Sequence, residues 1–339
     1  MRVSLAFLAF ISFISERDGD REVYVIDQRG QNERRITQRP DTADYNGPVS
    51  PDGKYILVTS VSGNAHGRKQ QFLRLPLAGG LPTPLGPPRS LLRHPAFSPD
   101  GRFLFFEGST EKFREIFRLR LDLGKGELLT NNREGNFWPS LSPDGKSLAF
   151  VSSRDQVAEV YVLRLGEKSA RRLTHTERDE WHPAWSPDGK LLLFSSDRDG
   201  ADRIYLQPLD GKPARRLTKE AVDPFVVEEH AEFMPNGKEV VFVRRQRDRQ
   251  DQLLSCDVLT RQTTRLLENS TGPLTEPAIS SDGDAVVFTV GLGEASQLFI
   301  LNLKSREFRQ LTLGKGPNWH PLWANAPRSI PITGQKYLW

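Results

Sequence analysis

A four-residue turn recurs six times along this chain at a nearly constant interval. It reads Ser-Pro-Asp-Gly in four copies and is degenerate in the last two, and its glycines are Gly53, Gly101, Gly145, Gly189, Gly237 and Gly283. Successive glycines are 48, 44, 44, 48 and 46 residues apart. A period of about 40 to 50 residues is typical of one four-stranded blade of a β-propeller. The repeat therefore predicts an all-β chain built as a ring of blades.

The chemistry of the repeated turn is structural. Proline pre-sets the first corner of a tight turn, aspartate hydrogen-bonds to nearby main chain, and glycine accepts the left-handed corner at no steric cost. These residues shape a hairpin, and they supply no nucleophile or general base. The turn is expected to connect the first two strands of each blade.

Short apolar strands surround each turn in the same order. In the fourth unit we predict strands at Pro183–Trp185, Leu191–Phe194, Arg203–Leu206 and Arg215–Thr218. Each is short, rich in apolar residues and bounded by Gly, Pro or Asp, which is typical of β-strands. We expect an insertion between two units at Glu220–Glu229. No amphipathic helix is expected, because no segment shows helical periodicity.

The two ends of the chain complete each other. Residues Phe13–Gly19 repeat Phe194–Gly200, and Trp319–Trp323 repeat Trp181–Trp185. The C-terminus therefore supplies the first strand of a blade whose other three strands come from the N-terminus. This predicts seven blades in a closed ring without an exposed sheet edge at the seam, with six blades as the alternative if Ile11–Ser15 is not a strand. Residues 1–323 are expected to form one domain and 324–339 a C-terminal tail.

Composition narrows the classes of partner. The chain has 47 basic and 43 acidic residues, a net charge of +4, and these charges are spread along it, so no nucleic-acid partner is expected. The single Cys256 excludes an internal disulfide. The apolar segment Val3–Ile14 is either a strand or a short export signal, and no segment is long enough to span a bilayer as a helix. We expect a monomer.

The motifs of the fourth unit resemble a known repeat. The unit begins with Trp181-His182-Pro183-Ala184-Trp185, followed directly by Ser186–Lys190. Three further motifs follow: Ser-x-Arg-Asp-Gly at 196–200, Ile204-Tyr205, and Arg-Arg-Leu-Thr at 215–218. This pattern resembles the TolB-type propeller repeat over about residues 11 to 323, and it is similar to the propellers of tricorn-like and prolyl-oligopeptidase-like peptidases. The resemblance implies a bacterial, periplasmic or cell-envelope protein, whereas an N-terminal strand leaves a cytoplasmic location open. The chain shows no Gly-x-Ser-x-Gly elbow, so a serine hydrolase is not expected.

One position of the repeat gathers most of the histidines. Propeller connectivity brings the loops before each first strand and the loops between second and third strands to one end of the central channel. Aligning the units there gives Asn46, His94, Trp138, His182, His230, Glu276 and His320, which include four of the chain's six histidines. Either an ancestral Trp-His-Pro unit was copied for structural reasons, or the side chains face the channel and bind a ligand. Trp181 and Trp319, with Trp138, are candidates for a stacking surface there.

Two functions follow from this position. The first is a non-enzymatic binding propeller that presents a His- and Trp-rich face to a protein or peptide partner and needs no cofactor. The alternative is a metal-assisted lyase or hydrolase acting on an acidic saccharide, similar to the oligogalacturonate lyases, which use histidine-held metal. In that case a divalent metal in the channel mouth would be held by His182, His230, His320 and Glu276.

Charged loops are expected around the same end. They include Arg17-Asp18, His66 with Arg68-Lys69, Arg154-Asp155, Asp197–Asp199 and the basic run Arg244–Asp251. Solvated hairpin loops or rim contacts for an acidic partner both explain them. The pairs Arg34-Arg35, Arg171-Arg172 and Arg215-Arg216 fall on outer strands, where they are expected to discourage edge-to-edge pairing.

Overall fold

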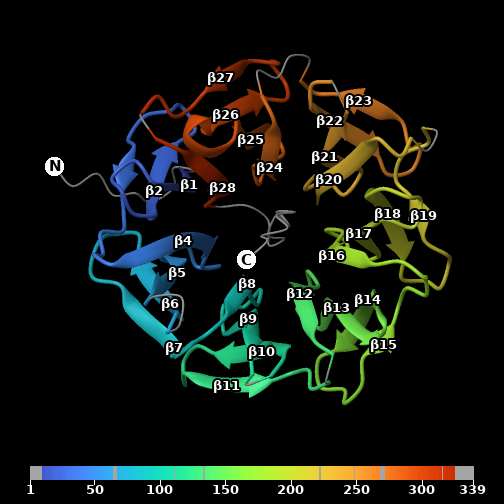
Figure 1. The fold of residues 1–339 in the computed structure, drawn as a ribbon, viewed down its shortest axis with the longest axis horizontal. Helices are drawn as coiled ribbons and strands as arrows, with labels where there is room; N and C mark the ends of the chain where they lie inside the picture. Colours follow the sequence, from blue (N-terminus) through green and yellow to red (C-terminus); the bar gives the residue numbers. More distant parts are fainter. Residues whose placement is uncertain are drawn as a thin grey trace.

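Seven four-stranded antiparallel sheets stand around one axis (Figure 1). The computed structural model describes residues 10–63, 67–110, 112–132, 134–220, 223–247, 249–267, 272–314 and 316–324. The sheet order confirms the seven-bladed propeller, and the six-bladed alternative is wrong. Blade 1 is β28-β1-β2-β3, and blades 2 to 7 begin with β4, β8, β12, β16, β20 and β24.

The strands occupy four equivalent places in each blade. The innermost strands are β4 (Thr42–Val49), β8 (Leu92–Phe97), β12 (Asn136–Leu141), β16 (Glu180–Trp185), β20 (Val226–Phe233), β24 (Leu274–Ile279) and β28 (Asn318–Trp323). The second strands are β1 (Phe10–Ser15), β5 (Tyr55–Ser62), β9 (Phe103–Ser109), β13 (Ser147–Asp155), β17 (Leu191–Ser196), β21 (Glu239–Gln246) and β25 (Ala285–Val290).

The outer half of each blade is shorter. The third strands are β2 (Glu22–Asp27), β6 (Lys69–Pro76), β10 (Arg114–Arg120), β14 (Val157–Arg164), β18 (Arg203–Pro208), β22 (Gln252–Asp257) and β26 (Gln297–Asn302). The outermost strands are β3 (Arg34–Arg35), β7 (Thr83–Arg89), β11 (Lys125–Leu128), β15 (Arg171–Arg172), β19 (Arg215–Arg216), β23 (Thr263–Arg265) and β27 (Phe308–Gln310). A 3₁₀ turn, η1 (Gly293–Ala295), is the one helical element of the described residues, and none of their helices is long and apolar enough to cross a membrane.

Two predicted boundaries move in the structure. The innermost strand of blade 5 begins at Glu180, three residues before the predicted start, and its outermost strand ends at Arg216. Leu217, which follows that strand, has a side chain that is fully buried between blades. The last four residues of the predicted insertion Glu220–Glu229 belong to β20, which begins at Val226.

The two ends of the chain close the ring. Strand β28 pairs antiparallel with β1, with Ile11 opposite Trp323 and Ser15 opposite Asn318. The segment Phe10–Ser15 is therefore a strand, which was one of the two interpretations of the apolar N-terminal segment. Residues 1–9 and, apart from Ala324, the predicted tail lie outside the described residues.

Apolar side chains fill the spaces between neighbouring blades. One buried cluster joins Leu193 and Leu206 of blade 5 to Val240 and Phe242 of blade 6. Fully buried phenylalanines recur on the second strands, and Phe194 stacks on Tyr205 with ring centroids 5.8 Å apart. Burying one such ring contributes about 2 to 3 kcal/mol. Blade-to-blade burial therefore holds the ring rigid around its axis.

The repeated turns pack against one another at one end of the ring, which we call the underside. A Cβ placed on Gly145 would lie 3.0 Å from Cδ of Pro99, the proline of the preceding turn, and one on Gly101 would lie 3.7 Å from Pro51. Each turn glycine except Gly53 therefore makes room for the proline of the preceding turn in addition to adopting a left-handed φ. The opposite end, where the predicted functional loops lie, is the top end.

Candidate functional site

Every innermost strand carries a β-bulge at nearly the same place. The pairing register shifts between Trp181 and Ala184 in β16 and between Asn46 and Val49 in β4, and the other five strands shift at equivalent positions. Bulges re-aim side chains and are common beside functional sites. In six strands the first bulged residue is the position singled out by the sequence, whereas in β4 the bulge falls one residue later, at Gly47 and Pro48, and Asn46 stays paired with Val58. The seven positions are here called the axial residues: Asn46, His94, Trp138, His182, His230, Glu276 and His320.

Six axial residues adopt a left-handed backbone although none is glycine. Their φ angles are 50° at His94, 49° at Trp138, 55° at His182, 54° at His230, 56° at Glu276 and 56° at His320. The conformation costs roughly 1 to 2 kcal/mol for a residue with a Cβ. Such strain persists only where the surrounding structure holds it, and it is concentrated at ligand sites.

The axial residues of blades 7, 1 and 2 form a hydrogen-bonded chain. The main-chain N–H of His320 donates to Oε2 of Glu276 at 2.7 Å, and Nδ2 of Asn46 donates to the main-chain oxygen of His320 at 3.0 Å. The Nδ1 atom of His320 lies 2.9 Å from Oδ1 of Asn46. Because that amide oxygen accepts, Nδ1 carries the proton, and Nε2 of the neutral ring is left as an acceptor.

Aromatic rings connect the axial residues of blades 3, 4 and 5. The ring centroid of Trp138 lies 4.6 Å from that of His182 and 6.3 Å from that of His94. The imidazole of His182 also lies within electrostatic range of His94 and His230, and His320 lies within range of His94. Side chains from blades that are not neighbours therefore converge near the ring axis, which the sequence left undecided.

Two of the converging imidazoles, those of His182 and His320, are uncharged at neutral pH. Burial, with smaller effects of His94 and His230, lowers the pKa of His182 to about 3. Burial also lowers the pKa of His320, although the charge of Glu276 opposes it. Both side chains retain part of their accessible surface. They therefore offer neutral donors and acceptors, rather than cations, to anything that approaches along the axis.

Glu107 is an important residue that the alignment of axial positions missed. It is fully buried in β9, and its Oε2 lies 3.2 Å from Nδ1 of His94 and accepts the N–H of Trp138 at 3.3 Å. Burial alone would raise the pKa of Glu107, but His94, Arg114 and that N–H outweigh it and lower the pKa. A charged residue at the end of the run Phe103–Phe106 was the sequence signal that could have revealed it.

The four predicted metal ligands are only partly brought together. Glu276 contacts the main chain of His320, while Nε2 of His230 lies 3.4 Å from Oε1 of Glu229. Oε1 of Glu276 is buried without a hydrogen-bond partner among the described residues. Within the same residues, no three His, Cys, Asp or Glu side chains are arranged to hold a metal ion. The donor set therefore does not form a complete metal site, and no chemical step is derived through one.

Trp319 belongs to a second aromatic cluster at the top end. Its ring meets Tyr45 edge-on with centroids 6.4 Å apart, and the guanidinium carbon of Arg21 lies 5.7 Å from its centroid. Trp181 is half-buried in β16. Tyr45 and Arg21 extend the stacking surface beyond the tryptophans named from the sequence, because Arg21 hydrogen-bonds to Tyr45 and both side chains contact Trp319.

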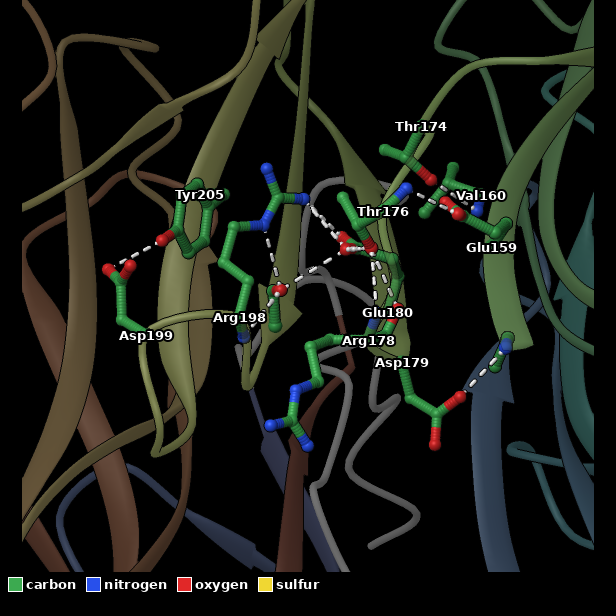
Figure 2. A network of polar contacts seen from close by, with 12 residues as sticks. Glu159, Val160, Thr174, Thr176, Arg178, Asp179, Glu180, Arg198, Asp199 and Tyr205 are labelled. Carbon is green, nitrogen blue, oxygen red and sulfur yellow. Dashed lines mark hydrogen bonds and ion pairs between the residues drawn. The ribbon is translucent and has the colours of Figure 1, made fainter. Parts of the chain in front are cut away.

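Most charged loops at the top end have partners within the ring. Arg198 donates to Glu180 and Tyr205 donates to Asp199 (Figure 2). The same Asp199 pairs with Arg216. Equivalent contacts join Arg154, Asp155, Tyr161 and Arg172 in blade 4. In the basic run, Arg244 pairs with Glu228 and Arg245 with Glu229. These loops therefore stabilise the ring, and the second arginine of each outer pair binds a loop carboxylate.

The fold and these repeated contacts agree with the comparison by sequence. The description "TolB beta propeller domain" matches residues 77–272, more than half of the chain. This chain belongs to the TolB β-propeller family. A search of the curated proteins gave no match.

Solved structures confirm the fold of this TolB-family propeller. TolB from Acinetobacter baumannii is 21% identical with a TM-score of 0.59, over 93% of this chain and 82% of that one. A putative TolB from Agrobacterium tumefaciens is 23% identical with a TM-score of 0.54, over 96% and 99%. An oligogalacturonate lyase in complex with manganese is 16% identical with a TM-score of 0.69, over 88% and 84%. At these identities the likeness concerns the fold alone, and a shared fold does not fix a shared function.

Proposed function

We propose that this propeller is a non-enzymatic binding protein whose top end engages a protein or peptide partner. The observation that carries the proposal is the ring of six left-handed axial residues, which holds histidine, tryptophan and glutamate side chains at one end of a rigid scaffold. A purely structural bulge would be served at lower cost by glycine. The retained strain therefore favours a binding role for the side chains themselves.

The chemistry of the top end fits a peptide surface. Neutral imidazoles and the indoles of Trp138 and Trp319 offer stacking and hydrogen bonding, and Phe225 is 59% exposed in the loop before β20. Aromatic side chains carry much of the energy of protein–protein interfaces. The family resemblance supports a periplasmic, cell-envelope setting and a monomeric ring for this role.

Capture with matched variants tests the proposal. The purified chain, immobilised through a surface tag, is compared with the double variant Trp138→Ala/His182→Ala and with Lys190→Ala on the underside, after circular dichroism has shown that all three fold. Photo-crosslinking at Trp319 identifies any captured protein that contacts the top end. We expect capture by the wild type and Lys190→Ala and at least a tenfold loss in the double variant. Equal capture by all three would refute the assignment of the top end.

Metal analysis addresses the alternative, a metal-assisted lyase or hydrolase acting on an acidic saccharide. Protein purified without chelator or His-tag is measured for transition metals, alongside His182→Ala and His320→Ala variants. A binding propeller predicts less than about a tenth of an equivalent, since imidazole sites hold such ions tightly. Near-stoichiometric metal that disappears in the histidine variants would favour the enzyme instead.

A further inference from the structure

A cavity opens on the underside between blades 3 and 4, away from the axial residues. Its volume is about 460 Å³, within the range of small-molecule sites. The two Ser-Pro-Asp-Gly turns of these blades form one wall, and the ends of β9, β10 and β14 form the others. The cavity therefore depends on two blades at once and is independent of the proposed function of the top end.

The floor of this cavity is apolar. Phe103 and Leu165 line it and pack against the buried cluster that joins the two blades. The guanidinium carbon of Arg118 lies 4.8 Å from the ring centroid of Phe103. A flat apolar group could rest on this surface beside a fixed cation.

Two cations at the rim of the cavity, Lys146 and Arg164, form no salt bridge within the described residues. Nζ of Lys54 and Lys190, the equivalent lysines of other turns, pair with the aspartates of their own turns at 3.3 Å and 3.6 Å. In the described part of the chain no carboxylate lies within salt-bridge distance of Lys146 or Arg164. Arg118 by contrast is held by Glu127, with Nε 3.2 Å from Oε2.

The two carboxylates of the cavity are occupied by their own turns. Oδ1 of Asp144 accepts the hydroxyl of Ser142 at 2.6 Å and the N–H of Lys146 at 3.0 Å. Asp100 accepts equivalent hydrogen bonds from Ser98 and the N–H of Arg102. These bonds hold both carboxylates within their turns, and although the charge of Asp144 still acts on Lys146, neither Lys146 nor Arg164 forms a salt bridge in the described part of the chain.

Two of the three cations that line the cavity, Arg118 and Arg164, are particular to this interface, whereas Lys146 occupies a turn position that carries lysine in other blades as well. Strand pairing places Arg118 opposite Phe105 and Arg164 opposite Ser147. The equivalent residues at the next interface are Val162 and Pro208. If the repeat required these two arginines for structural reasons, the next interface would carry charged residues at the equivalent positions.

We propose that this cavity is a binding site for a small organic anion with a flat apolar body, such as an aromatic carboxylate. The apolar body lies against Phe103 and Leu165, and the carboxylate lies between Lys146 and Arg164. Hydrogen bonds from charged donors to a carboxylate are stronger than neutral ones, so the rim selects for the anion.

A charge series of probes tests the site on the full chain. 1-Naphthoate, 1-naphthylmethanol and 1-naphthylmethylamine are titrated by calorimetry into the wild type. We expect 1-naphthoate to bind at least about tenfold more tightly than the alcohol, and the amine not to bind, because one charge-assisted contact is worth about that factor. A 1-naphthoate dissociation constant above about 10 mM, or tighter binding of the amine, overturns the proposal.

Matched variants locate the binding. Lys146→Ala and Arg164→Ala alter exposed side chains and leave the core intact, and Lys190→Ala removes the paired equivalent lysine. We expect the double variant Lys146→Ala/Arg164→Ala to lose about a hundredfold in affinity for 1-naphthoate and Lys190→Ala to be unchanged. Unchanged affinity in the double variant would place the probe elsewhere and overturn the site. Neither result depends on whether the top end captures a partner.

Discussion

The guanidinium carbon of Arg198 lies 4.3 Å from the ring centroid of Tyr205, and Nη2 of the same arginine reaches both carboxylate oxygens of Glu180 at 2.7 and 2.8 Å (Figure 2). The arrangement joins three strands, β16, β17 and β18, at the top end. Arg154 lies over Tyr161 at 4.3 Å and Arg17 over Tyr24 at 4.6 Å in equivalent places. The Ser-x-Arg-Asp motif of the repeat is thus a clamp inside each of these blades.

Removing this clamp should destabilise blade 5 strongly. Glu180 is fully buried, and burial raises its pKa to about 7 even though Arg198 lowers it. Arg198→Ala leaves that carboxyl without its cation, so we expect a loss of about 2 to 3 kcal/mol in the free energy of unfolding, measured by urea denaturation. Arg178→Ala, an exposed arginine of the adjoining loop, is the control and should change it by less than about 0.5 kcal/mol. Equal losses in both would contradict the clamp.

The neutral state of His182 predicts a pH dependence of stability. Its pKa is about 3 in the folded chain against an ordinary value of 6.5. Below pH 6.5 the unfolded chain binds a proton that the folded chain does not, so this contribution is complete above pH 6.5 and is lost as the pH falls towards 3. The slope is at most about 1.4 kcal/mol per pH unit, and less because the side chain keeps some solvent contact.

Urea denaturation between pH 4 and pH 7 isolates this contribution. The slope of unfolding free energy against pH should be shallower in His182→Gln than in the wild type, while His175→Gln, at an exposed loop position, should leave the slope unchanged. The difference between variants removes the titration of all other groups. An identical slope in His182→Gln and the wild type would mean that the folded state already binds that proton.

The fold could be predicted because its signals are local and repeated. The turn at Gly145, the strands around it and the matching chain ends each follow from short-range chemistry, and six copies reinforce one another. The axial position could be found by the same alignment. The convergence of His94, His182 and His230 could not, because it depends on a left-handed bulge that histidine residues do not signal in the sequence.

The partners of the charged loops were also beyond the sequence. Arg198 and Asp199 look like solvated loop residues, but the partners that occupy them, Glu180 and Arg216, come from two other strands. Arg203 could not be understood from the sequence either. It is buried at the position where blades 1 and 4 carry a glutamate, Glu22 and Glu159. In blade 5 the carboxylate that accepts the hydroxyl of Thr218 comes instead from Glu228 of the next blade. Such compensation between blades is a tertiary property.

Ring closure should depend on a buried indole. Nε1 of Trp323 in β28 donates to the main-chain oxygen of Ala278 in blade 7 at 2.9 Å. Trp323→Phe keeps an aromatic ring but leaves that carbonyl unpaired, so we expect a loss of about 1 to 3 kcal/mol. Hydrogen exchange should accelerate first in β1 and β28, which that side chain anchors. Uniform acceleration over all blades would indicate that the seam is not the weakest joint.

Two turn glycines separate backbone strain from packing. Gly53 and Gly145 have the same φ of 69° in identical Ser-Pro-Asp-Gly turns, but a Cβ on Gly53 meets nothing within 4 Å, whereas one on Gly145 would lie 3.0 Å from Pro99. Gly53→Ala should therefore cost only the left-handed conformation, about 1 kcal/mol. Gly145→Ala must also push two turns apart, and we expect about 2 kcal/mol or more in urea denaturation. Equal costs would show that the turns can separate freely, and that the contacts between prolines and glycines do not hold the underside together.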